Sequence, residues 1–129
     1  MFLDASAIVA IIILEPGHRE LAHRIDASDA TLTSPVAFVE AALAIARDHR
    51  IGFERARTLV ERFLERTQTV IVPVDPQAGY LALDAYREYG KGRHRARLNF
   101  GDCFAYAMAK QHGVPLLYKG DAFVQTDLA

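Results

Sequence analysis

The chain opens with the stretch MFLDASAIVAIIIL, residues 1–14. Its apolar start predicts a short buried strand at Phe2 to Asp4. The residues that follow predict a helix over Ser6 to Leu14. Asp4 therefore stands where the strand gives way to the helix. A buried carboxylate costs several kcal/mol unless a cation or hydrogen-bond donors compensate it. The opening stretch thus predicts both an α/β fold and a site where its first strand ends.

The rest of the chain continues this alternation of strands and helices. Further strands are expected at Thr31–Ser34, Thr69–Val74, Val114–Tyr118 and, as a short final strand, Thr126–Leu128. Helices are expected at His18–Ala27, Pro35–Arg50, Phe53–Arg66, Pro76–Tyr89 and Gly101–His112, with one helical turn at Asp121–Val124. This order predicts a single domain, residues 1–129, built on a parallel sheet with helices on both faces. Ligands of such sheets bind beyond the carboxyl ends of the strands.

Composition excludes several classes of protein. A hydrophobic content of 51% excludes disorder, and 15 basic against 16 acidic residues leave no overall basic field, so nucleic-acid binding must use a local patch. The one cysteine, Cys103, excludes an internal disulfide framework and a cysteine-based zinc site. The apolar run Ile8 to Leu14 is far shorter than the ~20 residues of a membrane span, so no membrane contact and a cytoplasmic location are expected.

Four acidic residues lie in surroundings that are otherwise apolar. They stand at the ends of predicted strands or in the first turns of predicted helices, and they are Asp4, Glu40, Asp102 and Asp121. Four such carboxylates suggest one shared cation, and oxygen-only ligands favour Mg²⁺ or Mn²⁺ over zinc.

Each of these residues also has an ordinary structural reading. Asp4 could cap the next helix, although Ser6 could do this equally well and leave Asp4 free. Glu40 could be a core glutamate paired with an arginine, and Asp102 could serve as a helix cap. Asp121 could be a loop aspartate or a cap, and Asp127 has the same ambiguity.

A local basic patch, Lys91 to Arg97, comes just before Asp102. Arginine side chains match phosphate oxygens in a bidentate way, so Arg93, Arg95 and Arg97 could clamp the phosphates of a polyanion. The alternative is an ordinary solvated loop.

Four stretches of the chain resemble a known family. They are MFLDASAIVA (1–10), GKGRH (90–94), LNFGDCFAYA (98–107) and PLLYKGDAF (115–123). The first looks like the opening of PIN-domain ribonucleases, and the others look more specifically like VapC-type toxins, the nucleases of bacterial toxin–antitoxin pairs. The resemblance covers essentially the whole chain.

The resemblance implies a PIN-like three-layer fold whose five-stranded parallel sheet has the order 3-2-1-4-5. It also implies RNA cleavage that depends on Mg²⁺ or Mn²⁺ and leaves a 5′-phosphate and a 3′-hydroxyl. By position the catalytic cluster is Asp4, Glu40, Asp102 and Asp121, with Asp4 and Asp102 as the firmest metal ligands and Ser6 in support. Two departures, Ala5 for a common threonine and Arg95 for a common proline, bear on RNA preference.

The expected mechanism uses two cations about 3.5–4 Å apart. Asp4 and Asp102 would hold the first, while Glu40 and Asp121 would complete or bridge the second through water. Phosphoryl-transfer domains are the rival enzymes. A haloacid-dehalogenase-like domain requires a second acidic residue at the position of Ser6. A receiver-like domain requires a phosphorylated aspartate, for which Asp75 could serve, and an acidic pair, but Asp4 has no acidic neighbour. A non-catalytic RNA- or protein-binding module is the remaining alternative.

The family resemblance also implies partners, namely an RNA substrate, a separately encoded protein antitoxin and a second copy of the chain in a homodimer. Ile11 to Leu14 are four large aliphatic residues in a row, which one helix cannot bury on a single side. We therefore expect a hydrophobic groove, formed by Ser6–Leu14, His18–Ala27 and Phe53–Arg66, that takes an antitoxin helix, a self-contact or both. The alternative is that these aliphatic residues lie in a helix that the domain itself covers on all sides.

Overall fold

A small parallel sheet lies at the centre of the computed structural model, which describes residues 1–129. Its strands are only two residues long and have the order β3-β2-β1-β4. Phe2 pairs with Leu32 on one side and with Leu116 on the other. The strands are β1 (Phe2–Leu3), β2 (Leu32–Thr33), β3 (Val70–Ile71) and β4 (Leu116–Leu117).

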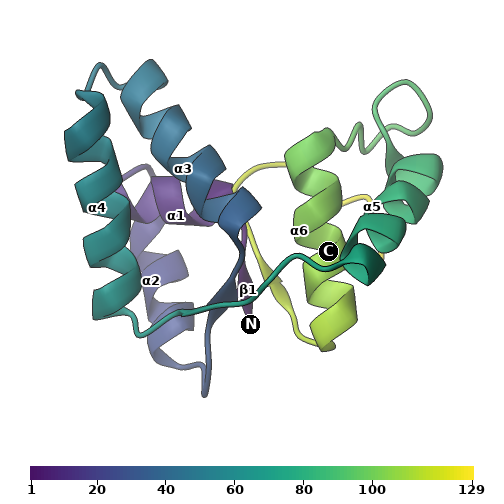
Figure 1. Cartoon of the computed structure of the whole chain (residues 1–129), viewed down its shortest axis with the longest axis horizontal. Coiled ribbons are helices and arrows are strands. Elements are labelled where there is room, and N and C mark those ends of the chain that lie inside the picture. The colour runs from purple at the N-terminus through teal and green to yellow at the C-terminus, as the bar shows by residue number, and fades with distance from the viewer.

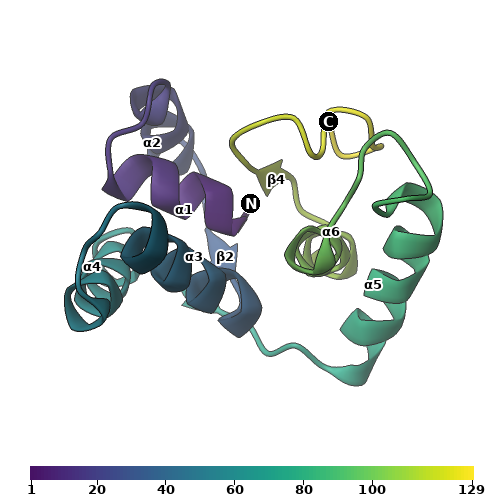
Figure 2. The same cartoon turned by 90° about the horizontal axis from the view of Figure 1, so that it is seen from above.

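Six helices flank this sheet in two groups, as Figure 1 shows. The first group consists of α1 (Ala5–Ile12), α2 (His18–Asp26), α3 (Pro35–Asp48) and α4 (Phe53–Arg66). The second group consists of α5 (Pro76–Tyr89) and α6 (Phe100–His112). The strands lie between the two groups, which confirms the expected layers of helices, sheet and helices (Figures 1 and 2).

Alternation along the strands divides the buried residues into two cores. Successive side chains of a strand point to opposite faces of the sheet. Phe2 and Leu116 accordingly belong to the core under α5 and α6, whereas Leu3 and Leu117 belong to the core under α1 to α4. Each face of the sheet therefore has its own apolar core.

The expected fifth strand is absent, so the prediction of a five-stranded sheet was wrong. Thr126–Leu128 forms turns because its hydrogen bonds are local: the Thr126 N–H donates to the Phe123 carbonyl at 3.0 Å, and the Leu128 N–H donates to the Thr126 hydroxyl at 3.1 Å. Asp121–Val124 forms bends and a turn and is not the expected helical turn. The order 3-2-1-4 of the four observed strands agrees with the expectation.

Several helix ends differ slightly from the sequence-based ranges. Helix α1 ends at Ile12, and Leu14 just beyond it has a left-handed backbone with φ of 59° and a 67% exposed side chain. Helix α3 ends at Asp48 and not at Arg50, which also has a positive φ of 52°. None of the helices combines the length and the apolar character that crossing a membrane requires.

Candidate active site

Asp4 is buried, with 3% of its surface exposed, where β1 gives way to α1. Its Oδ2 accepts hydrogen bonds from the Ser6 N–H, at 3.0 Å, and from the Ser6 hydroxyl. Asp4 is therefore itself the cap of α1, and of the two caps that the sequence allowed, Ser6 is not the one used. The other oxygen, Oδ1, is buried without any hydrogen-bond partner, so the carboxylate can serve a cap and a ligand together.

The electrostatic surroundings of Asp4 disfavour its charge. Burial raises the pKa of Asp4 to about 6, the charge of Asp102 adds to the rise, and the hydrogen bonds from Ser6 oppose it. An uncompensated carboxylate of this kind is what a bound cation would stabilise.

Ser6 links Asp4 to the segment that follows β4. Its Oγ accepts a hydrogen bond from the Lys119 N–H at 3.0 Å while the hydroxyl donates to Asp4. The Lys119 Nζ in turn donates to the Pro16 carbonyl at 2.6 Å. These bonds hold the segment that bears Asp121 against Ser6, at the start of α1, and against Pro16, beyond the end of α1.

Glu40, on α3, is partly buried beside the start of α6. Burial raises its pKa to about 7, and the charges of Asp4 and Asp102 raise it further. Arg47 opposes this rise, but its guanidinium is paired with Asp48 at 2.8 Å. The ordinary reading of Glu40 as one half of a core ion pair is therefore wrong.

Asp102 lies in the first turn of α6 and takes part in its cap. Its Oδ2 accepts from the Asn99 N–H at 3.0 Å, and the Asn99 Oδ1 accepts from the Asp102 N–H at 2.9 Å. Burial raises the pKa of Asp102, and the Asn99 N–H opposes the rise. The reciprocal cap uses one carboxylate oxygen, so Asp102 retains a second oxygen for a ligand.

Asp121 differs from the other three carboxylates because it is exposed, in a bend after β4. Its charge is not among the causes that raise the pKa values of Asp4, Glu40 and Asp102. The structure thus couples three of the four predicted residues electrostatically and places Asp121 on the neighbouring bend.

Asp127 is engaged elsewhere in the molecule. It accepts a hydrogen bond from the Tyr106 hydroxyl at 2.6 Å and pairs with Lys110, which fixes the C-terminal segment against α6. This contact lowers the pKa of Asp127, although partial burial opposes the shift.

The carboxylates suit a hard cation that retains much of its water. No three His, Cys, Asp or Glu side chains are arranged to bind one ion together. Mg²⁺ is usually bound by one or two carboxylates plus waters and substrate phosphates, so a full protein cage is not required. The partnerless Asp4 Oδ1 and the second oxygen of Asp102 fit such a site.

The basic patch forms an ordered loop between α5 and α6. Its backbone closes through hydrogen bonds from Lys91 to Leu98 and from Leu98 to Tyr89, both 3.0 Å long. The loop encloses an open hollow of about 530 Å³, and its lining includes the predicted residues Arg93, Arg95 and Arg97. All three arginines are exposed, so their charges face solvent around this hollow.

Comparison with known proteins identifies the family of this chain. Residues 1–128 match the PIN domain family. The chain is 43% identical to a ribonuclease VapC of Mycolicibacterium smegmatis over 129 residues, covering 100% of this chain and 98% of the relative. It is 42% identical to ribonuclease VapC30 of Mycobacterium tuberculosis, covering 100% and 96%.

The chain belongs to the VapC ribonucleases of the PIN-domain family. The fold has a solved counterpart in Mycobacterium tuberculosis VapC20, described as a sarcin-ricin loop cleaving toxin. That structure superposes with a TM-score of 0.69 at 18% identity, covering 92% of this chain and 88% of VapC20. A likeness at this identity concerns the fold alone.

The rival phosphoryl-transfer readings are thereby wrong, and the structure shows what Asp75 does instead. Its side chain caps α5 by accepting from the Ala78 N–H at 2.9 Å, and it accepts from the Gln111 amide at 2.9 Å. A receiver-like domain would need this carboxylate free to accept a phosphoryl group.

Two site features escaped the sequence reasoning. Glu40 approaches the backbone of Gly101 so closely that a side chain at this position would clash with it. A Cβ there would lie 2.1 Å from the Glu40 Oε2. Lys119 fastens the bend after β4 to Pro16. The only sequence signal was their nearness to Asp102 and Asp121.

Proposed function

We propose that this VapC ribonuclease cleaves RNA with the help of Mg²⁺ or Mn²⁺ held by Asp4 and Asp102. The observation that carries the proposal is the Asp4 Oδ1, which is buried and has no hydrogen-bond partner. Such an atom is costly unless something binds it. The raised pKa values of Asp4, Glu40 and Asp102 all reflect carboxylates that a cation would stabilise.

The residues of the site divide the remaining work. A divalent cation, when bound, lowers the pKa of a coordinated water and offsets charge on the phosphate. Ser6 fixes the orientation of the Asp4 carboxylate through two hydrogen bonds. Glu40, with a pKa of about 7, is suited to accept a proton from water near neutral pH. Asp121 is close along the chain to Lys119 and would contribute through water.

The basic loop supplies the contact with the substrate backbone in this proposal. Arg93, Arg95 and Arg97 present exposed cations just before α6, whose first turn carries Asp102. Single-stranded RNA follows such cationic grooves through its phosphates.

RNA digestion with and without EDTA tests the metal site directly. Asp4→Asn and Asp102→Asn should each remove most cleavage in the presence of Mg²⁺ or Mn²⁺, because each loses a charged ligand. An asparagine at 102 still offers an oxygen to the Asn99 N–H, so the cap of α6 should persist. Asp29→Asn, at an exposed position before β2, is the matched control. Full activity in either site variant would contradict the proposal.

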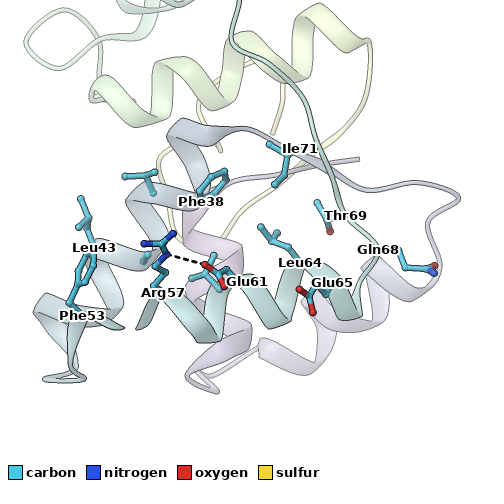
Figure 3. A pocket seen from close by; sticks show the side chains of 13 residues that line it. Phe38, Leu43, Phe53, Arg57, Glu61, Leu64, Glu65, Gln68, Thr69 and Ile71 are labelled. Carbon is cyan, nitrogen blue, oxygen red and sulfur yellow. Dashed lines mark hydrogen bonds and ion pairs between the residues drawn. The ribbon is translucent and has the colours of Figure 1, made fainter. Parts of the chain in front are cut away.

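We propose further that a protein antitoxin, made in the same cytoplasm, binds the groove between α3 and α4. This groove has a volume of about 790 Å³, and Figure 3 shows Phe38 and Leu64 in it, with the Arg57–Glu61 pair at 3.0 Å. Leu43 and Phe53 leave 48% and 55% of their surface exposed there. An amphipathic antitoxin helix would cover such a surface.

The proposed groove differs from the one expected from the sequence. It lies between α3 and α4, and not among α1, α2 and α4. Ile11, Ile12 and Ile13 are partly buried against the core of α1 to α4, which leaves Leu14 as the exposed member of the run.

Charged substitutions in the groove test the antitoxin proposal. Phe53→Glu should abolish capture of the co-expressed neighbouring small gene product while RNA cleavage stays as in the wild type. Tyr80→Glu, at an exposed position on α5, is the control and should still bind it. Light scattering on the same samples tests the expected homodimer, and Phe53→Glu protein that still forms the complex would contradict the groove assignment.

A further inference from the structure

A second apolar groove lies between α5 and α6, on the opposite side of the sheet from the α3–α4 groove. Its volume is about 320 Å³, and aromatic side chains provide much of its lining. Phe100 is 73% exposed, Leu83 is 67% exposed and Tyr86 is 43% exposed. Exposed aromatic side chains gathered around one groove point to a binding surface.

The aromatic rings of this groove are positioned by the fold. Phe100 and Phe104, one turn apart on α6, have ring centroids 5.0 Å apart at an interplanar angle of 56°. Phe104 is only partly buried, so the pair offers a supported ring surface at the start of the helix.

One end of the groove, where the last turn of α5 lies beside the first turn of α6, adjoins charged groups. The Tyr86 hydroxyl donates to the Lys91 carbonyl at 3.0 Å, which joins this end to the loop carrying Arg93, Arg95 and Arg97. Phe100 is in the same first turn of α6 as Asp102. A chain bound along the groove would thus have cations beside it and the carboxylate site within one helical turn.

We infer that the α5–α6 groove is a base-stacking subsite, in which Phe100 stacks on an unpaired nucleobase of the RNA substrate. This inference rests on the proposed ribonuclease function and adds where a base is held. Proteins bind single-stranded nucleic acid with a positive groove for phosphates and aromatic rings for bases. The cationic loop beside the groove favours a polyanion over an uncharged apolar segment as its occupant.

Fluorescence of RNA containing 2-aminopurine tests the subsite, because stacking on an aromatic ring quenches this base. The wild-type protein in EDTA, which prevents metal-dependent cleavage, should quench an unpaired 2-aminopurine. Phe100→Ala should abolish the quench and raise KM for RNA cleavage in Mn²⁺ by about tenfold, with little change in kcat. Phe100→Trp should restore both readouts.

Matched controls separate stacking from other roles of the groove. Tyr80→Ala removes a similarly exposed ring from α5, outside this groove, and should leave both readouts unchanged. A Phe100→Ala protein with wild-type quench and KM would overturn the inference. So would a lower solution mass for Phe100→Ala without any quench by the wild type, because the groove would then be a self-contact. A wild-type protein that quenches but cleaves no RNA would contradict the ribonuclease proposal and support the stacking subsite.

Discussion

Gly101 decides how closely Glu40 can approach α6. A Cβ at position 101 would lie 2.1 Å from the Glu40 Oε2, whereas one at Gly79 would meet nothing within 4 Å. We expect Gly101→Ala to displace the flexible Glu40 carboxylate and reduce RNA cleavage as much as Glu40→Gln, with only a small change in stability. Gly79→Ala, in α5, should keep activity and stabilise the fold by ~0.5–1 kcal/mol. Activity assays with melting curves decide, and an active Gly101→Ala variant would show that the position of Glu40 is not critical.

The residue scale also shows what a sequence can and cannot reveal about a site. Asp4 and Glu40 were predicted because a charge among apolar neighbours is anomalous wherever the chain folds. The sequence left open whether Asp102 is a helix cap or a metal ligand. In the structure its Oδ2 takes part in the cap of α6, and its other oxygen remains free for a ligand. The space that Gly101 leaves for Glu40 was not predictable, because it depends on how closely α3 packs against α6.

The loop between α5 and α6 is the element that should govern the salt dependence of RNA binding. Replacing Arg93, Arg95 and Arg97 with alanine should weaken binding to all single-stranded sequences. With each phosphate contact that is lost, fewer counterions are released from the RNA on binding. The slope of log K against log salt should flatten by about 0.7 per lost contact. Binding titrations at several salt concentrations measure it, with Arg62→Ala on α4 as the control. Equal slopes for the triple variant and the wild type would leave the loop a solvated surface.

Elements were predictable where their signals are local. Caps and prolines placed α3 and α5 closely, because Ser34 and Asp75 cap these helices ahead of a proline. The last segment, Thr126–Leu128, was mistaken for a strand because its residues form hydrogen bonds with their own neighbours, which the sequence alone does not reveal. The α3–α4 groove was missed because it depends on which exposed faces of two helices meet.

The whole molecule should lose stability as pH rises in the absence of metal. Burial raises the pKa of Glu40 from an ordinary 4.5 to about 7, so the folded state binds more protons than the unfolded state between these values. This difference reduces the free energy of unfolding as pH rises through the interval. Glu40→Gln should therefore melt higher than the wild type at pH 8 and show a smaller difference at pH 5. Melting curves in EDTA measure this, with exposed Glu65→Gln as the control; no difference at pH 8 would contradict it.

Divalent cations should stabilise the whole fold by binding its native state. Millimolar Mg²⁺ or Mn²⁺ should raise the Tm of the wild type, because a ligand of the folded state shifts unfolding by mass action. Asp4→Asn should weaken this response, and Asp29→Asn, at an exposed position before β2, should preserve it. A wild-type Tm that ignores both metals would count against a preformed site.

The lone cysteine gives this molecule a built-in reporter. Cys103 is 3% exposed beside the α5–α6 groove, and burial, reinforced by the charge of Asp102, raises its pKa to about 11. The thiol should therefore react with alkylating reagents only when the helices around it open. Since the chain has no other thiol, the labelling rate measures how often α6 opens next to the carboxylates. A ligand bound in the groove should slow this labelling, and no engineered probe is needed to detect it.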